Sequence, residues 1–162
     1  MIQRVQTLFL LGVIICMSLA VTFPAWEKTN NETKVKYTLD AFTWQEFSQN
    51  ESGLWELSET KPTYYLAGIG GLICLIALYS IFQYKQRGLQ IKMGALNAFL
   101  MMVFIALATY FIYQGESKIG METRGIFKPG FFLPLGAMIL NSLANRFIKK
   151  DEDLVRSVDR IR

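Results

Sequence analysis

The stretch Tyr64–Tyr84, YYLAGIGGLICLIALYSIFQY, runs for 21 residues without a charged side chain. About 20 consecutive apolar residues are enough for a helix to cross the hydrocarbon core of a bilayer. Three further apolar stretches lie at about Val5–Phe23, Met93–Tyr113 and Phe131–Phe147, and the last is marginal in length. We therefore predict an all-α membrane protein, a bundle of four transmembrane helices forming a single domain over residues 1–162.

The distribution of charge predicts the orientation of these spans. The loop Lys85–Lys92 carries three bases and no acid, and the tail after Asn145 carries six bases against four acids. The segment Trp26–Pro62 instead carries seven acids against four bases. Because basic residues near the ends of spans stay in the cytoplasm, we expect both termini inside and residues 26–62 outside. The first span resembles a signal peptide, but its apolar run continues to Phe23, so we expect it to be retained.

The outside segment, residues 26–62, is expected to be a small folded cap that contains β-structure. The alternation in Val35–Asp40 is typical of a half-exposed strand, and Gly53–Leu57 is a candidate for a second one. Between them, Ala41–Gln49 is expected to form a short helical turn. Trp44 and Trp55 either anchor the cap at the membrane surface or form a surface for partner docking.

Small residues recur along the second span and favour close helix packing. In lipid, small side chains allow two helix backbones to approach closely. We expect this stripe to pack within the chain, so that Gly71→Leu would loosen the bundle. The predicted helix-packing residues are Ala67, Gly70, Gly71, Cys74 and Ala77.

Three asparagines are expected to lie inside the bilayer. Asn141 and Asn145 are four residues apart and share one helix face, and Asn97 could meet them across a helix pair. Such amides usually hold membrane helices together. The alternative is a polar pocket for the head group of a lipid or a quinone.

Several classes of function are disfavoured by composition. The chain has no histidine, and its two cysteines, Cys16 and Cys74, both fall within predicted spans. No acid or base lies deep in a span, whereas proton relays and voltage sensors need such groups. The sequence has no P-loop, dinucleotide fingerprint, HExxH or CxxC motif. We therefore expect no enzymatic activity, no cofactor, no metal site and no nucleic-acid partner, but membrane lipids and other membrane-protein subunits as partners.

The tail is expected to continue the fourth helix beyond the membrane as a cytoplasmic C-terminal helix. Leu154, Val158 and Ile161 fall near one face of it, and an exposed apolar stripe of this kind seeks a partner, whether the chain's own cytoplasmic loop, the lipid surface or another protein. We therefore predict these three residues as a second docking surface.

The sequence LANRFIKKDEDLVRSVDRIR, residues 143–162, resembles the C-terminal signature of a bacterial four-span family. The opening Met1–Gln6 and the stretch Leu89–Lys92 with Leu96 and Asn97 are similar to the same family. This family, found mainly in Bacteroidota, is a domain of unknown function. The resemblance implies a small protein of the bacterial inner membrane and brings no known activity or site residues.

A second similarity concerns architecture alone. Four spans, inside termini and a first outside loop containing Gly53-Leu54-Trp55 resemble the claudin-like tetraspan layout, although the cysteine pair of the claudin loop is missing. Our leading hypothesis is a non-enzymatic subunit or assembly factor of a larger inner-membrane complex. A lipid- or quinone-binding protein is the alternative, and a claudin-like adhesion or barrier protein is the third.

Overall fold

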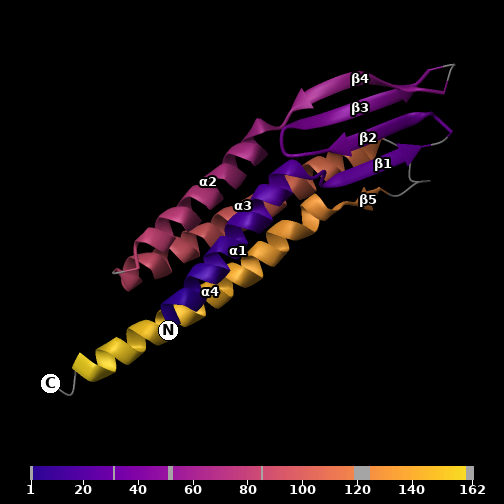
Figure 1. Ribbon diagram of the computed structural model, residues 1–162. Coiled ribbons are helices and arrows are strands. Elements are labelled where there is room, and N and C mark those ends of the chain that lie inside the picture. Colours follow the sequence, from indigo (N-terminus) through magenta and orange to yellow (C-terminus); the bar gives the residue numbers. More distant parts are fainter. Residues whose placement is uncertain (1, 31, 51–52, 85, 119–124, 160–162) are drawn as a thin grey trace.

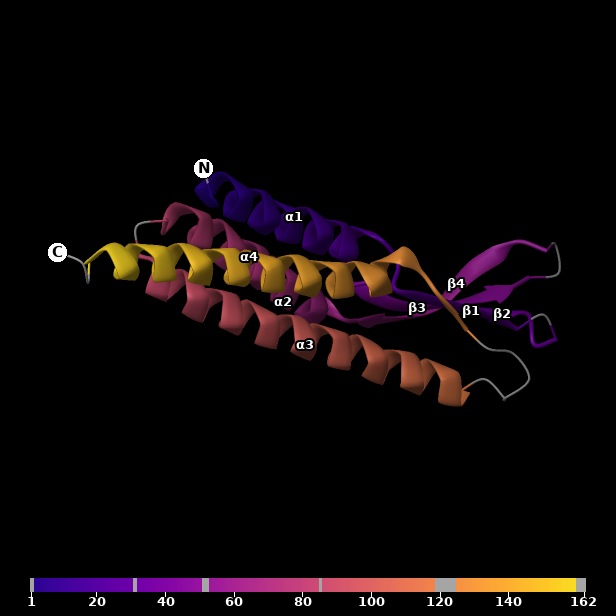
Figure 2. The same ribbon diagram turned by 90° about the horizontal axis from the view of Figure 1, so that it is seen from below.

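The computed structural model describes residues 2–159, except residues 31, 51–52, 85 and 119–124. Four long helices lie side by side, and a small sheet stands at one end of them (Figures 1 and 2). We call this end of the bundle the sheet end and the opposite end, where the N-terminus lies, the far end. The helices are α1 (Ile2–Thr22), α2 (Tyr64–Phe82), α3 (Arg87–Lys118) and α4 (Pro129–Asp159).

All four helices are long and apolar enough to cross a membrane, which confirms the number of apolar helices predicted from the sequence. Two of them exceed the length a bilayer requires. At 1.5 Å per residue, α3 with 32 residues and α4 with 31 residues each span roughly 47 Å, against about 30 Å for the hydrocarbon core. The structure therefore extends α3 toward the sheet and α4 past the far end.

The buried positions of each helix repeat in alternating steps of three and four residues. This spacing averages 3.5 residues and is the pattern of left-handed coiled-coil packing. It explains why the helices stay in contact along their length. The buried positions among the described side chains are Gln6, Leu10, Val13, Met17 and Ala20 in α1, Leu66, Gly70, Ile73, Ala77 and Ser80 in α2, Gln90, Gly94, Asn97, Met101, Phe104, Ala108, Ile112 and Gly115 in α3, and Gly130, Pro134, Ala137, Asn141, Ala144 and Ile148 in α4.

The small-residue stripe of α2 divides between two faces. Gly70 is buried, and a β-carbon built on it would lie only 2.5 Å from Cγ2 of Val21 in α1. Gly71 is exposed and has nothing within 4 Å of its β-carbon position. The expectation that Gly71→Leu loosens the bundle is therefore wrong, because this position faces out of it. The rest of the stripe packs in or against the core: Ala67, Cys74 and Ala77.

The sheet has five antiparallel strands in the order β4-β3-β2-β1-β5. Their bounds are β1 (Trp26–Asn30), β2 (Val35–Leu39), β3 (Thr43–Gln49), β4 (Trp55–Pro62) and β5 (Ile126–Phe127). The predicted strand over Val35–Asp40 is confirmed as β2, and the strand expected at Gly53–Leu57 begins later and runs longer, as β4. The chain between α1 and α2 thus supplies four strands, and the segment before α4 supplies the fifth.

The helical turn expected over Ala41–Gln49 is wrong, since most of this segment is β3. Asp40 makes the turn that starts the strand: its Oδ1 accepts the backbone N–H groups of Phe42, at 3.0 Å, and Thr43, at 2.7 Å. An aspartate that binds the backbone two and three residues ahead favours a turn over a helix. The chain therefore reverses directly from β2 into β3.

Candidate functional site

The inner face of the sheet rests on the sheet end of α3. Trp26, Leu39 and Trp44 lie in one row across β1, β2 and β3, and each is at most 4% exposed. Together with Tyr37 they form a hydrophobic cluster with Ile112 of α3. This cluster seats the sheet on the bundle.

Trp26 fills a space that two glycines leave open. A β-carbon on Gly115 of α3 would lie 2.8 Å from Cη2 of the Trp26 ring, and one on Gly125 would overlap the indole nitrogen. Trp26 is fully buried as a result. Trp26 is therefore a core residue of the junction between sheet and bundle.

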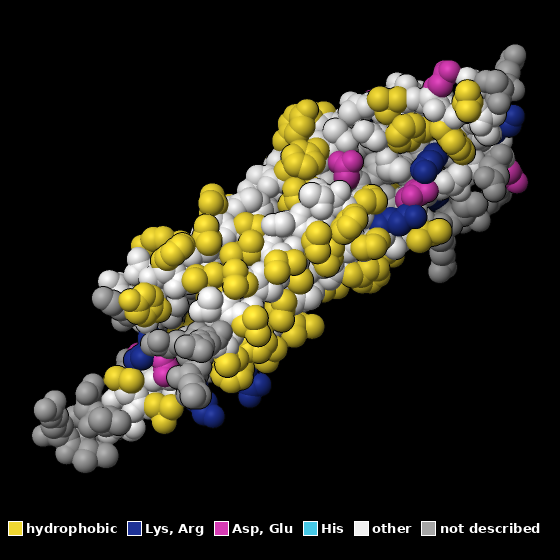
Figure 3. Space-filling model, in the orientation of Figure 1, with side chains coloured by type: hydrophobic (Ala, Val, Ile, Leu, Met, Phe, Trp, Pro, Cys, Tyr) yellow, Lys and Arg dark blue, Asp and Glu magenta, His cyan; other side chains and the backbone are white. Residues whose placement is uncertain are grey.

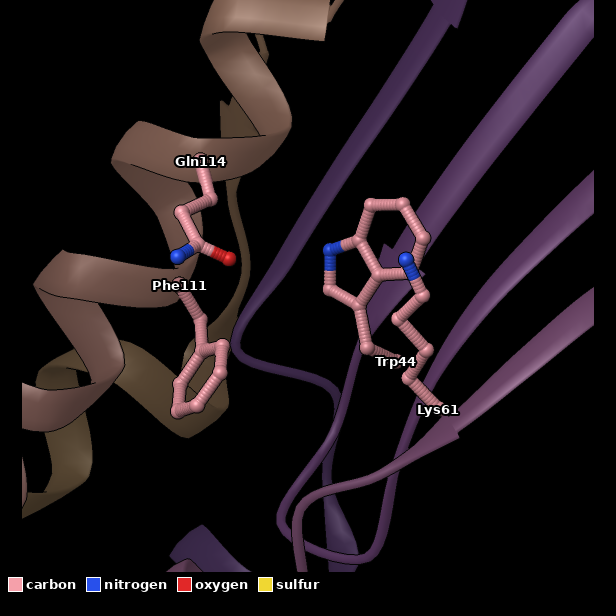
Figure 4. Close-up of a pocket in the computed structure, with 4 residues that line it drawn as sticks. All are labelled: Trp44, Lys61, Phe111 and Gln114. Atoms are coloured by element: carbon pink, nitrogen blue, oxygen red, sulfur yellow. The ribbon is translucent and has the colours of Figure 1, made fainter.

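Trp44 lines a small cavity at the same junction. Figure 4 shows Phe111 and Gln114 on the helix facing Trp44 and Lys61 on the strands. The cavity has a volume of about 40 Å³, close to the roughly 30 Å³ of a single water molecule. The Lys61 ammonium lies 5.6 Å from the centre of the Trp44 ring, within the range of a cation–π interaction. Because Trp44 is only 4% exposed, it does not form the docking surface expected of it.

The outer face of the sheet is different, because it exposes apolar side chains. Phe47 pairs with Leu57, and Gln49 pairs with Trp55, on the face opposite to Trp44. Trp55 is 41% exposed and Leu57 56%. With Leu54, which is 67% exposed, Trp55 and Leu57 form what we call the β4 patch. Trp55 is thus placed where a docking residue would have to be.

An ion pair between a buried lysine and a partly exposed glutamate connects the sheet to α3. Lys28 of β1 is 1% exposed, and its Nζ lies 2.5 Å from Oε2 of Glu116. The other oxygen of Glu116 accepts the backbone N–H of Gly125 at 2.9 Å. A buried ammonium needs such a partner to offset its loss of hydration. This ion pair joins strand β1 of the sheet to helix α3.

A second cluster of ion pairs, centred on Glu27, joins β1 to its neighbours, and all of its members are partly exposed. Glu27 lies 3.0 Å from the ammonium group of Lys36 on β2 and 3.0 Å from that of Lys128, just before α4. Strands β1 and β2 and the start of α4 are therefore joined through one carboxylate.

The three asparagines predicted to lie inside the bilayer are on α3 and α4, and two of them donate hydrogen bonds to neighbouring helices. Asn97 of α3 donates to the carbonyl of Ile73 on α2 at 3.3 Å, and Asn141 of α4 donates to the carbonyl of Gly94 on α3 at 2.8 Å. The side chain of Asn145 lies against the same glycine. Asn141 and Asn145 do share a face, but the hydrogen bond of Asn97 goes to Ile73 of α2. Each amide that donates holds two helices together.

The far end of the bundle holds another polar contact that the sequence did not reveal. Gln90 of α3 is 3% exposed and donates to the backbone carbonyl of Ser80 on α2 at 2.7 Å. Arg87 lies 2.8 Å from Asp151, which ties the last described turns of α4 to the start of α3. The positions of these residues along their helices are compatible with both contacts. The sequence alone does not show which helices lie next to each other, so the contacts could not be predicted from it.

The predicted tail surface is described only in part. Ile148 is fully buried, whereas Leu154 is 48% exposed and Val155 41% exposed. The side chain of Val158 and the whole of Ile161 lie outside the described residues. Of the three residues predicted for docking, Leu154 is the one whose side chain is described, and it is exposed.

The comparison with protein families gives a match over almost the whole chain. Residues 2–161 match DUF4293, a domain of unknown function. The chain belongs to this family. No curated protein matches the sequence. The predicted resemblance to an uncharacterised family is confirmed, and the bacterial origin and the claudin-like similarity stay predictions.

Three features of this DUF4293 chain are candidates for a functional role. In the described ranges, no three His, Cys, Asp or Glu side chains come together as metal ligands. These features are the β4 patch, the ion pairs made by Glu27 and Lys28 of β1, and the polar contacts between the helices of the bundle. The first of these is the one exposed to a partner outside the apolar helices.

The Glu27 cluster predicts a pH-dependent contribution to stability. The hydrogen bond from Lys36 holds the pKa of Glu27 below its ordinary value of 4.5, against partial burial, and Lys128 adds to the effect. Because the folded pKa is below the unfolded one, the stabilisation is present above about pH 4.5 and is lost as the pH falls through the folded pKa. Glu27→Gln should lower the unfolding midpoint near pH 7, and this difference should shrink as the pH is lowered below 4.5 through the folded pKa. Thermal unfolding in detergent over this pH range measures the difference, and a difference that did not change with pH would refute the prediction.

Proposed function

We propose that this protein is a non-enzymatic, multi-pass membrane protein that binds an extended segment of a second protein through strand β4. In this role it serves as a subunit or assembly factor of a larger membrane complex. The observation that carries the proposal is the edge of the sheet: β4 is eight residues long, ends the strand order, and is exposed at every residue.

An edge strand of this length offers unpaired backbone groups to another chain. Soluble proteins usually shorten, bend or cover such edges, because an exposed one pairs with a foreign strand. In this sheet, β4 contains Lys61 and one bulge, opposite Glu46 and Phe47. These two features alter the edge strand, but neither covers it. Addition of a partner strand would satisfy the free groups, which is a recurring mode of peptide recognition.

The β4 patch supplies the side-chain part of the same surface. Trp55 and Leu57 alternate along the strand, so they lie on one face and can fill alternate pockets of a partner. Tryptophan is among the residues that contribute most to protein–protein affinity. Backbone pairing would then provide affinity and these side chains specificity.

The charge of the sheet indicates the chemistry of the partner. Residues 26–62 carry seven acids and four bases, and β4 itself exposes Glu56 and Glu59. A basic extended segment would therefore be attracted and oriented by this surface. We propose such a segment, contributed by another membrane-associated protein, as the occupant of the β4 edge.

The proposed orientation follows the distribution of basic residues. Arg87, Lys92 and the basic tail belong to the far end, which we place in the cytoplasm. The sheet then projects on the outer side of the bacterial inner membrane. The exposed Leu154 of the tail would offer a second docking surface on the cytoplasmic side.

The ligand-binding alternative receives less support. The amides of Asn97 and Asn141 donate to backbone carbonyls of neighbouring helices, so they contribute to packing. The helix-packing role of the asparagines is therefore preferred over a lipid or quinone pocket among them.

The proposal predicts that one substitution in β4 removes the partner. Leu57→Glu adds a charge to the β4 patch at a position already 56% exposed, so the fold should persist. Native mass spectrometry of the tagged full chain, extracted gently from its own membranes, should show an additional chain at fixed stoichiometry. We expect Leu57→Glu to reduce this species roughly tenfold or more, as for a loss of about 1.4 kcal/mol.

Ile126→Glu is the matched control. Ile126 is an aliphatic residue, 65% exposed, on the opposite edge strand of the same sheet. This variant should retain the partner at the level of the unmodified protein. Equal retention by Leu57→Glu, or equal loss from both variants, would contradict a specific site at β4.

A further inference from the structure

A hollow at the far end of α4 joins two cationic side chains to an apolar floor. It has a volume of about 360 Å³ and is lined by Leu143, Arg146, Phe147 and Lys150. Figure 3 shows Lys and Arg side chains at the margin of the hydrophobic surface toward this end of the molecule. The hollow is separate from the sheet and from the surface proposed above.

The two cations project from one helix face and are available to an anion. Arg146 and Lys150 are four residues apart and exposed. In the described part of the chain, neither forms an ion pair, and the nearby Asp151 is engaged by Arg87. A guanidinium beside an ammonium is suited to phosphate, because arginine donates in a fork and lysine adds a point charge.

The apolar part of the hollow comes from the same stretch of α4 as the two cations. Leu143 and Phe147 are half-buried there. The Phe147 ring stacks on Phe9 of α1, with ring centres 5.5 Å apart and planes inclined by 17°. This contact holds the floor in place between two helices. Each cation follows an apolar side chain by three residues, Arg146 after Leu143 and Lys150 after Phe147, so the apolar side chain of each pair lies about one turn closer to the middle of α4. An acyl chain lies deeper in a leaflet than its phosphate in the same way.

We infer that this hollow is a binding site for an anionic phospholipid, with the phosphate on Arg146 and Lys150 and an acyl chain along Leu143 and Phe147. Basic hollows beside transmembrane helices at a membrane boundary bind acidic lipid head groups in this way. The depth is appropriate, since Arg146 is the first charged residue after Lys128 and lies next to the last residue of the fourth apolar stretch. The site would attach the base of α4 to the leaflet around the far end.

Native mass spectrometry of the purified full chain tests the site, with phosphatidylglycerol and phosphatidylcholine as probes. We expect one phosphatidylglycerol to be retained at least about tenfold more strongly than phosphatidylcholine. The double variant Arg146→Gln/Lys150→Gln should lose this preference by roughly tenfold or more, from about a kilocalorie per mole for each basic residue. Arg146→Lys, which keeps the charge and loses the fork, should fall between the two.

Lys92→Gln/Lys149→Gln is the control with the same change in charge. Both lysines are exposed, Lys92 on α3 and Lys149 on α4, and neither lines the hollow. This variant should bind phosphatidylglycerol as the unmodified protein does. An equal loss in the control would reduce the effect to general surface charge and overturn the site. Displacement of the lipid by millimolar inorganic phosphate would also overturn it, in favour of a site for free phosphate.

Discussion

Gly130→Ala should prevent stable folding or lower the unfolding midpoint by roughly 10 °C, the largest effect expected for a single methyl group in this chain. Gly130 is the second residue of α4 and donates its N–H to the carbonyl of Pro24 at 3.1 Å. A β-carbon there would lie 2.6 Å from that same carbonyl oxygen and closer still to the oxygen of Phe23. Both obstacles are backbone atoms, so no side chain can move aside. We expect a cost of about 3 kcal/mol or more.

The control for this prediction is Gly136→Ala in the same helix. No atom lies within 4 Å of a β-carbon at Gly136. Alanine should therefore be tolerated and gain up to about 1 kcal/mol of helix propensity. The two variants are compared by thermal unfolding in one detergent. Similar midpoints would mean that the end of α1 does not cross the start of α4 as closely as described.

Gly70→Leu should separate α1 from α2 and cause aggregation on mild heating. The β-carbon position of Gly70 lies 2.5 Å from Cγ2 of Val21 and 3.6 Å from the ring of Phe104. A leucine needs space that the core does not have, and overpacking costs about 1–3 kcal/mol or more. The expected measurement is an earlier onset of aggregation by size-exclusion chromatography after heating.

Gly71→Leu tests whether the loss depends on the face of the helix. Gly71 follows Gly70 in the sequence but is exposed, with open space around its β-carbon position, so a leucine at 71 would meet lipid or detergent. We expect the heated sample to elute as the unmodified protein does. If Gly71→Leu aggregated as readily as Gly70→Leu, the assigned phase of α2 would be wrong.

The four helices were predictable because each is long, apolar and continuous in sequence. Length and composition are local properties, and they are enough to identify helices that can cross a membrane. The packing face of α2 was not predictable in the same way. Every turn of that helix is apolar, so periodicity does not separate Gly70 from Gly71. Only the neighbouring α1 and α3 decide which glycine is buried.

The sheet was harder to predict because its pairing is not local. β5 has only two residues, Ile126 and Phe127, and pairs with Trp26 and Glu27 about a hundred positions earlier. No alternation can be read from two residues. The segment that became β3 has aromatic residues at spacings that also fit a helical turn, and pairing with β2 and β4 overrides that local preference.

The tryptophans show the same limit for the candidate site. Trp44 and Trp55 both lie in a polar segment, and the sequence assigns them the same role. They end on opposite faces of the sheet, one against α3 and the other exposed. The face of each was set by the register between β3 and β4, which includes a bulge. The sequence could therefore indicate the segment of the proposed docking surface and one of its residues, Trp55, but it offered no basis for separating Trp55 from the buried Trp44.

The most direct test of a partner at β4 is site-specific photo-crosslinking in native membranes. A photoreactive residue replaces Ser58, which is exposed in the middle of β4, and in a parallel sample it replaces Ile126 on the opposite edge. We predict one discrete crosslinked product of defined additional mass from position 58 and none from position 126. No product from position 58, or the same products from both positions, would contradict the proposal that this family member binds a partner through the edge of its sheet.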